Sequence, residues 1–467
     1  GDPAPFAAVA PGESAASAPG GPAALAAPRT TTLKALGLAT NAEQLAAEAA
    51  QIFDGPIWRR ALRRWQWRGR ALTLEVDAAP DALAAEAKRL WPEMHAKRPV
   101  DARRVILAGD RIVYTPEEYA FRVSGTALRA ALLAALQAAD GAAYGRGPAG
   151  LSAGGGGSPG HDGAFPLGRP VPLPGALRPD SPLLTDEPLR VAAPLDRIAP
   201  RVTAAALKAQ GIERVIASYS TSFASSGEGR VHNIAKTASV VHDRLLAPGD
   251  IFDYGKIIEE TGRLYGFREA PVILNGKLVP GIGGGICQVS TTLYNAVLLA
   301  GLDIVERRSH SLPVTYAPLG RDATFAEGHI NFKFRNSTDS YLLIRATAAN
   351  GVLTIKLFGS LDPSVTYEIR TVQLETIPPG KTYVRNPSLP AGTVELLQRG
   401  KPGYVVETYR VKKVNGKPVS EERISRDTYK AQPALYASNS GKENAGGRTA
   451  PPREPILEDG VRGPVFR

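Results

Sequence analysis

A long glycine- and proline-rich segment, residues 141–195, most constrains how this chain can fold. It contains the tetraglycine Gly154–Gly157 and repeated prolines, and glycine and proline account for 48 and 39 of the 467 residues. A segment of this composition cannot bury a core and favours a flexible linker. A chain of this length fills roughly two to four domains, so we expect several domains joined by flexible segments.

The composition on either side of this linker predicts three globular regions in an α+β protein. We expect a small α+β module at residues 31–140, a central mixed α/β domain at 196–360 and a β-rich module at 365–436. Residues 1–30, rich in alanine, glycine and proline, are predicted to be a flexible stalk. Residues 437–467 are predicted to be a disordered tail.

Hydrophobic periodicity predicts the elements inside these regions. Apolar side chains at helical spacing predict helices at residues 41–52, 80–91 and 126–139. Alternation predicts strands at residues 65–76, 104–114, 405–414 and 418–424. The dipeptide Asn415-Gly416 between the last two strands is a strong hairpin signal.

The net charge of the chain and the lengths of its apolar runs limit the kinds of partner that it can bind. The chain has 56 basic and 45 acidic residues, a net charge of +11. Two interpretations stay open. One is a basic surface for polyanions such as nucleic acid, anionic lipid or teichoic acid polymers, and the other is a compositional preference for arginine. No aromatic-basic motif is present, so no nucleic-acid partner is expected. No apolar run reaches the roughly 18 residues of a membrane helix, and because the chain opens at Gly1, we expect that an upstream signal or anchor was removed.

The stretch at residues 279–302, VPGIGGGICQVSTTLYNAVLLAGL, carries the strongest chemical signal. Three glycines, 283–285, precede Cys287, the only cysteine, and a helical pattern follows it. A helix N-terminus favours the thiolate, so we expect Cys287 to react faster than a free thiol. The N–H groups of Gly285–Gln288 are expected to stabilise an oxyanion in acyl transfer. The stretch matches neither phosphate-binding pattern, GxxxxGK[ST] or GxGxxG.

A thiolate nucleophile needs a base and a group that orients the base. His310, in a polar stretch after a predicted strand, is the candidate base, with His232 in reserve. Asp322 is the candidate orienting carboxylate, and Arg321 is the candidate clamp for a substrate carboxylate. The candidate site comprises Cys287, His310 and Asp322 for catalysis, Gly283, Gly284, Gly285 and Gln288 for the oxyanion and loop, and Arg321, His232, Ser290 and Thr291 for substrate binding.

Each of these residues also has a structural interpretation. Cys287 can be a buried small hydrophobe at a helix start, His310 a surface histidine and Asp322 a turn residue. A single cysteine excludes a multi-cysteine metal site. We therefore expect no metal and no cofactor.

The central region resembles the VanW family. The resemblance rests on YSTSF at 219–223, RVHNI at 230–234, PGDIFD at 248–253, GGGICQVSTTLYN at 283–295, HSLPVTY at 310–316, GRDAT at 320–324 and NFKFRN at 331–336. The family takes its name from vancomycin-resistance gene clusters, and some clostridial members are L,D-transpeptidases.

The resemblance implies that Cys287 attacks a carbonyl of a peptidoglycan stem tetrapeptide. The acyl thioester would then pass to an amine of a neighbouring stem and form a crosslink. His310 and Asp322 match the family's HS and GRDAT positions, and their roles as base and orienting group follow from the chemistry.

Two flanking regions resemble modules of cell-surface proteins. Residues 56–139 are similar to a peptidoglycan-binding domain, on the motifs PVDA at 99–102 and IVYTP at 112–116. Residues 367–435 are similar to the G-five (G5) domain, on PAG at 390–392 and RGKPG at 399–403. The latter resemblance implies binding to polymers that contain N-acetylglucosamine.

Two functions of different class are consistent with these features. The first is a cysteine acyltransferase of the L,D-transpeptidase type, acting on peptidoglycan outside a bacterial cell. The second is a non-catalytic peptidoglycan- or glycan-binding surface protein with a structural VanW domain. A hydrolase would use the same thiolate and differ only in that water takes the acyl group. The expected partners are stem peptides, glycan strands and anionic wall polymers.

Overall fold

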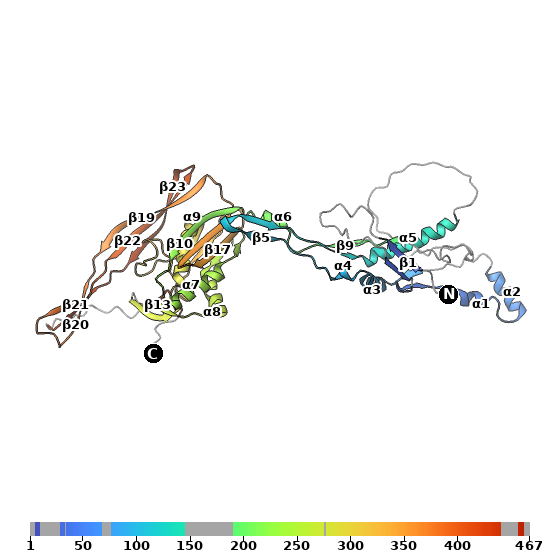
Figure 1. Cartoon of the computed structure of the whole chain (residues 1–467), viewed down its shortest axis with the longest axis horizontal. Helices are drawn as coiled ribbons and strands as arrows, with labels where there is room; N and C mark the ends of the chain where they lie inside the picture. The colour runs from blue at the N-terminus through green and yellow to red at the C-terminus, as the bar shows by residue number, and fades with distance from the viewer. Residues whose placement is uncertain are drawn as a thin grey trace. The chain divides into compact units, whose positions relative to one another are not determined.

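The computed structural model describes residues 5–9, 29–32, 34–67, 76–144, 190–274, 277–439 and 456–461. The chain divides into two compact units, drawn in Figure 1. The first unit comprises residues 1–103 and 115–204, and the second comprises residues 104–114 and 205–467. Helices and strands occur in both units, and the C-terminal part is rich in strands, so the predicted multidomain α+β class is confirmed.

The first unit has a small core between the helices α3 (Pro80–Leu90) and α5 (Gly125–Tyr144). Leu83 of α3 and Leu132 of α5 are fully buried, because the apolar stripes of the two helices pack together. The other helices are α1 (Ala42–Ala50), α2 (Ile57–Gln66) and α4 (Pro92–Ala96). The strands are β1 (Pro5–Val9), β2 (Arg29–Thr32), β3 (Leu38–Thr40), β4 (Val76–Ala78), β7 (Ala120–Val123), β8 (Arg190–Ala192) and β9 (Leu195–Ile198).

Two sequence predictions differ from the structure of this unit. Within the predicted flexible stalk, β1 pairs with β2 and β8, because a strand pair needs only backbone groups and not large side chains. The predicted strand at 65–76 begins inside α2, since Trp58, Leu62 and Trp65 recur at helical spacing. The rest of the stalk, residues 68–75 and residues 145–189 of the linker lie outside the described residues.

A hairpin from the predicted N-terminal module belongs to the second unit. Its strands are β5 (Arg103–Ile106) and β6 (Ile112–Thr115), as the alternation at 104–114 predicted. Ile106 and Ile112 pack against a small cluster formed by Ile212, Leu343 and Phe358. This hairpin, which the sequence assigned to the module at 31–140, therefore packs with the second unit through contacts between residues far apart in the sequence.

The helix α9 (Ile286–Leu299) runs through the core of the second unit, and every residue from 286 to 298 is buried. It packs on a four-stranded antiparallel sheet of order β10–β18–β17–β11. The bounds of these strands are β10 (Arg214–Ser222), β11 (Arg244–Leu246), β17 (Leu342–Ala349) and β18 (Val352–Gly359). A helix buried all round is apolar or internally hydrogen-bonded on every face, and α9 combines both.

The remaining elements of this region surround α9. The helices are α6 (Ala204–Ala209), α7 (Glu228–Val241) and α8 (Tyr254–Tyr265). One small sheet joins β12 (Ile251–Asp253), β16 (Lys333–Arg335) and β15 (Asp303–Glu306), and another joins β14 (Lys277–Ile282), β13 (Glu269–Leu274) and β25 (Leu457–Glu458). No helix within the described residues has the length and apolar character that crossing a membrane requires.

The C-terminal region consists of long strands, shown in orange and red in Figure 1. One sheet has the order β19 (Val365–Ile377), β22 (Gly403–Val414) and β23 (Lys417–Tyr429), and the other has the order β20 (Lys381–Arg385), β24 (Ala434–Ser438) and β21 (Val394–Gln398). The predicted turn at Asn415 and Gly416 joins β22 to β23, and both residues have positive φ.

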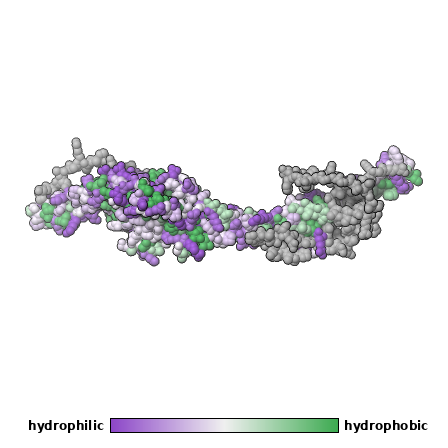
Figure 2. All heavy atoms as spheres, turned by 90° about the horizontal axis from the view of Figure 1, so that it is seen from above, coloured by the Kyte–Doolittle hydropathy of each residue, from purple (hydrophilic) through white to green (hydrophobic). Residues whose placement is uncertain are grey.

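Residues 456–461 of the predicted disordered tail have a defined place in the second unit. Leu457 and Glu458 form β25, which pairs with β13, and Glu458 and Asp459 are buried. Long-range contacts thus hold a segment whose local composition is that of a tail. Residues 440–455 and 462–467 lie outside the described residues. On the face shown in Figure 2, hydrophilic and hydrophobic residues of the described parts are intermixed.

Candidate functional site

A tight glycine turn sets Cys287 in the first turn of α9. Gly283 and Gly285 have φ of 95° and 105°, a region that favours glycine. Gly284 packs so closely on β13 that a Cβ there would lie 2.2 Å from the Pro271 carbonyl oxygen. The triple glycine is therefore required by the backbone path, and it delivers Cys287 to a fully buried position.

His310 and Asp322 lie side by side in the irregular segment that follows β15. His310 Nδ1 lies 2.6 Å from Asp322 Oδ2, and the His310 backbone N–H donates to the same oxygen at 2.7 Å. Asp322 thereby fixes both the ring and the backbone of His310. The other ring nitrogen, Nε2, is buried and forms no further hydrogen bond among the described residues.

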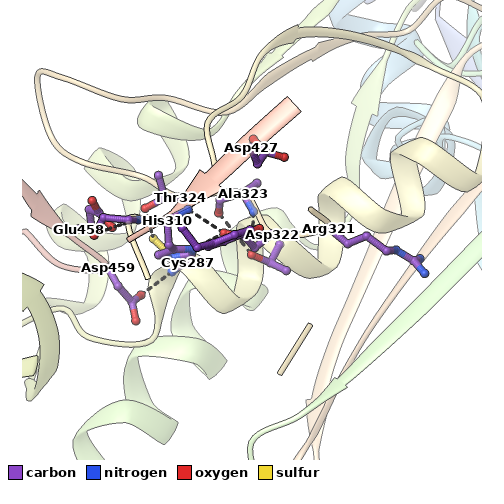
Figure 3. A network of polar contacts seen from close by, with 12 residues as sticks. Cys287, His310, Arg321, Asp322, Ala323, Thr324, Asp427, Glu458 and Asp459 are labelled. Atoms are coloured by element: carbon purple, nitrogen blue, oxygen red, sulfur yellow. Dashed lines mark hydrogen bonds and ion pairs between the residues drawn. The ribbon is translucent and has the colours of Figure 1, made fainter. Parts of the chain in front are cut away.

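Charge coupling ties His310 to the thiol as well as to Asp322. Burial opposes protonation of His310, but the interactions with Asp322 and Cys287 outweigh it and raise the pKa of His310 well above its usual value. Burial also opposes ionisation of Asp322, yet His310 and Arg307 lower its pKa to about 2. Asp322 is thus a carboxylate at neutral pH, and Figure 3 shows its side chain beside His310.

The segment at 323–325 is held against α9 and surrounds the sulfur. The Phe325 N–H donates to Cys287 Sγ at 3.0 Å, and Thr324 Oγ1 lies 3.6 Å from Sγ. Ser290 Oγ donates to the Ala323 carbonyl at 2.7 Å. Thr291 Oγ1 accepts from the Ala323 N–H at 3.0 Å. The two hydroxyl residues expected to bind substrate therefore hold this segment in place.

Three of the other expected site residues also have internal partners. Arg321 Nε donates to Asn295 Oδ1 at 2.8 Å, and Figure 3 shows its side chain pointing away from Cys287. His232 Nε2 lies 3.3 Å from the Gly266 carbonyl oxygen. Gln288 Nε2 donates to the Ser222 carbonyl at 2.9 Å. The structure does not bring Arg321 to the thiol.

Several residues of the site have no counterpart in the sequence-based expectations. Tyr429, at the end of β23, hydrogen-bonds to Asp322 Oδ1, and Arg307 lies 3.4 Å from the same oxygen. Arg307 Nη1 also donates to both oxygens of Asp427 at 2.6 Å. Tyr429 and Asp427 are more than 100 residues away from Asp322 in the sequence, so only Arg307, three residues before His310, had a local signal.

The backbone N–H groups at the start of α9, which were expected to stabilise an oxyanion, have partners in this structure. The N–H groups of Gly285 and Cys287 converge on a single oxygen, Asp459 Oδ1, at 3.1 and 2.7 Å. The N–H groups of Ile286 and Gln288 instead donate to loop carbonyls. Two amides that converge on one anionic oxygen have the geometry of an oxyanion hole, with a carboxylate oxygen in the place of the oxyanion.

The protonation of Cys287 differs from the sequence expectation. Burial and the neighbouring Asp459 carboxylate raise the pKa of the Cys287 thiol, although His310 opposes the rise. The helix terminus does not lower this pKa because Asp459 already occupies its N–H groups. At neutral pH, Cys287 is therefore a protonated thiol in this arrangement.

We expect the alkylation of Cys287 to need a higher pH than that of a free thiol. The thiolate is the reacting form, and a free thiol has a pKa of about 8.5. Because the Cys287 pKa is raised, its normalised rate with iodoacetamide should keep rising where the free-thiol curve has levelled. The same protein in denaturant should follow the free-thiol curve. A plateau in the folded protein below that pH would contradict this result.

Among the residues that the structure describes, no group of three or more His, Cys, Asp or Glu side chains is placed to hold a metal ion. The site is a set of proton donors and acceptors around a thiol.

Comparison with known proteins identifies two domain families. Residues 229–358 match the family described as VanW like protein, and residues 368–436 match the G5 domain. The chain therefore carries a VanW domain followed by a G5 domain, and of the three resemblances stated from the sequence these two are confirmed. Both families are cell-wall associated.

Two curated relatives share the VanW region. The "Uncharacterized protein YoaR" of Bacillus subtilis (strain 168) is 39% identical over 173 residues, 37% of this chain and 57% of that protein. The "Vancomycin B-type resistance protein VanW" of Enterococcus faecalis (strain ATCC 700802 / V583) is 28% identical over 155 residues, 32% of this chain and 56% of that protein. The chain thus matches little more than half the length of each relative.

Two solved structures share the G5 region. The "IgA1 Protease G5 domain structure" is 31% identical, with a TM-score of 0.14, and covers 17% of this chain and 94% of that one. The "Crystal structure of HP0197-G5" is 30% identical, with a TM-score of 0.12, and covers 16% of this chain and 96% of that one.

Proposed function

We propose that this chain, a VanW domain followed by a G5 domain, is a cysteine acyltransferase of the L,D-transpeptidase type that crosslinks peptidoglycan stem peptides. The observation that carries the proposal is the arrangement around Cys287. A buried Asp322 orients His310, His310 couples to the thiol, and two backbone amides converge on one anionic oxygen beside it.

In the first half-reaction, Cys287 Sγ attacks the carbonyl carbon before the terminal residue of a stem tetrapeptide. The neutral ring of His310 takes the thiol proton at Nε2, and the raised pKa of His310 favours this transfer. The amides of Gly285 and Cys287, once Asp459 has left them, bind the oxygen on which charge develops. The C–N bond breaks, the leaving amine takes the proton from His310, and a thioester remains on Cys287. Asp322 stabilises the protonated ring throughout.

In the second half-reaction, an amine of a neighbouring stem attacks the thioester carbonyl. His310 takes a proton from this amine and returns it to the departing sulfur, so the thiol is restored and a new amide bond joins the two stems. Attack by water in place of the amine would make the same site a hydrolase.

The flanking domains are the parts of the chain that we expect to bind the cell-wall partners. We assign glycan strands to the G5 domain and peptidoglycan to the N-terminal module, on the resemblances of their sequences. This assignment locates the chain outside the bacterial cell, at the cell surface or wall. Anionic wall polymers are further partners for a chain of net charge +11.

A non-catalytic wall-binding protein is the second candidate. It is favoured by the complete burial of Cys287 and by the raised pKa of its thiol, which are the properties of a structural cysteine. In that case the VanW domain would position the G5 domain and recognise peptide without reacting with it.

Incubation with purified peptidoglycan, followed by mass analysis of the muropeptides, tests the proposal. The chain should convert tetrapeptide stems to crosslinked dimers with loss of the terminal residue, and Cys287→Ala should form none while still sedimenting with peptidoglycan. Shortened stems without dimers would assign a hydrolase. Unchanged muropeptides with retained sedimentation would establish the binding protein and overturn the acyltransferase.

A further inference from the structure

We propose that the start of α9, the edge of β13 and the segment at 325–326 form a groove for an extended peptide that carries a carboxylate, and that the chain's own residues 456–461 occupy it and close the Cys287 site. The inference rests on the proposed function only in that the occupied site is the one containing Cys287. It concerns what the groove binds and how access to the thiol is controlled.

The backbone of residues 456–461 lies in the groove as an added strand. β25 pairs antiparallel with β13, with Ile273 opposite Glu458. Beyond it, the Asp459 N–H donates to the Phe325 carbonyl at 3.3 Å, and the Val461 N–H donates to the Ile282 carbonyl at 2.8 Å. Peptide recognition by strand addition uses these main-chain hydrogen bonds for affinity.

Two side-chain carboxylates fix the register of the segment. Glu458 Oε2 accepts from the N–H and the hydroxyl of Ser311 at 2.9 and 3.1 Å, directly beside His310. Asp459 Oδ1 accepts from the amides of Gly285 and Cys287, and Figure 3 shows Asp459 next to Cys287. Asp459 has a φ of 58°, which turns its side chain out of the strand and onto the helix terminus.

Independent features of the site indicate that it is built for a ligand. His310 Nε2 and Tyr316 Oη are both buried, and neither has a hydrogen-bond partner in the described part of the chain. Both side chains couple electrostatically to Cys287. Buried polar atoms normally find partners. The proposed function pairs His310 Nε2 with the Cys287 thiol, so Tyr316 Oη is the atom available to a group that a bound peptide would bring.

The hydrogen bonds that hold residues 456–461 are of a kind that a bound peptide could form in their place. Within the described residues, neither Glu458 nor Asp459 forms an ion pair, and each is held by backbone amides or a hydroxyl. A substrate peptide with a backbone strand and a carboxylate offers the same groups. Val461 also lines a cavity of about 680 Å³ whose wall includes Phe325, so release of the segment opens one side of this cavity.

Glycine at position 460 provides a way to displace the segment without altering charge. A Cβ on Gly460 would lie 2.5 Å from Val272 Cγ1 and 3.0 Å from the Ile282 carbonyl oxygen. Gly460→Val therefore excludes the segment by steric overlap. Asp459→Gly removes the carboxylate and tolerates the positive φ, whereas Asp459→Asn keeps an oxygen acceptor and is the matched control.

The experiment measures the rate of Cys287 alkylation by iodoacetamide in the full chain, by intact mass, at one pH. Cys287 is the only cysteine, so the signal has one source. Asp459→Gly and Gly460→Val should react roughly tenfold faster or more, because charge-assisted hydrogen bonds or close packing that hold the segment are lost. Asp459→Asn should react faster only to the extent that loss of the carboxylate charge lowers the Cys287 pKa, and therefore more slowly than Asp459→Gly.

A capped synthetic peptide with the sequence of residues 456–461 should slow the alkylation of Gly460→Val again. Unchanged or slower alkylation in both Asp459→Gly and Gly460→Val would overturn the inference, and so would a peptide without effect. The readout needs no turnover. Faster alkylation without any crosslinked muropeptide would therefore reject the proposed transpeptidase and leave the groove standing.

Discussion

His310→Gln should lower the rate of crosslink formation by about 100-fold or more, because general acid–base catalysis contributes roughly 10²–10⁴-fold. Glutamine still donates a hydrogen bond to Asp322, but it cannot take a proton from Cys287 Sγ or return it to the leaving amine. The measurement is the initial rate of dimer formation from purified tetrapeptide stems. The effect should appear mainly in turnover and not in substrate binding, since His310 acts on the transferred proton.

His232→Ala is the matched control for this prediction. His232 is a histidine of the same domain whose Nε2 lies 3.3 Å from the Gly266 carbonyl oxygen, and its replacement should leave the rate within about twofold, as for surface changes. A His232→Ala variant that loses activity while His310→Gln keeps it would transfer the role of the base to His232. Equal thermal unfolding of both variants would show that the difference is chemical.

Arg307→Met should destabilise the second unit by about 3–5 kcal/mol, the range for removing one partner of a buried ion pair. The Arg307 side chain is 4% exposed and lies between Asp427, 8% exposed, and Asp322, 1% exposed. Its removal leaves Asp427 buried without its bidentate partner and weakens the charge balance at Asp322. Calorimetry of the full chain should show a lower temperature for the transition of the VanW–G5 unit.

Arg370→Met provides the comparison for an exposed ion pair. Arg370 pairs with Glu421 on the G5 strands, with both side chains nearly half exposed, at 47% and 43%. Its loss should cost no more than about 1 kcal/mol, because water screens the pair and solvates the remaining carboxylate. Similar small effects for the two arginines would show that the Arg307 network does not join the VanW and G5 domains energetically.

Arg307 also links the G5 strand β23 to the candidate site. Asp427 and Tyr429 lie on β23, and both contact the network that orients His310. Burial and the neighbouring Asp322 raise the pKa of Tyr429, so its hydroxyl stays protonated and remains a donor to Asp322. The G5 domain thereby supports the VanW site as well as presenting its own surface.

Local signals in the sequence were sufficient to select Cys287, His310 and Asp322, the residues at the centre of the candidate site. The triple glycine predicted a loop leading into a helix, and the structure places Cys287 in the first turn of α9, with Gly283 and Gly285 at positive φ. His310, chosen for its polar neighbours and its place after a predicted strand, and Asp322, the candidate orienting carboxylate, lie side by side. Such motifs can be recognised in a sequence because a few neighbouring residues determine a turn, the start of a helix or the end of a strand.

The partners of these residues could not be read in the same way. Arg321 is next to Asp322 in the sequence, yet its side chain is paired with Asn295 and points away from Cys287. Ser290 and Thr291 follow Cys287 closely but are directed to the segment at 323–325. Proximity in the sequence therefore overestimated the set of residues available to a substrate.

The sequence by itself determined the domain families, the turn that places Cys287 and the pairing signals of the G5 hairpin, because each depends on neighbouring residues. Only the tertiary structure decided the protonation of Cys287 and the occupant of the site. Both depend on Asp459, 172 residues away from Cys287 in the sequence. A carboxylate at that separation leaves no local pattern, and its effect arises only when burial and the helix terminus bring it next to the thiol.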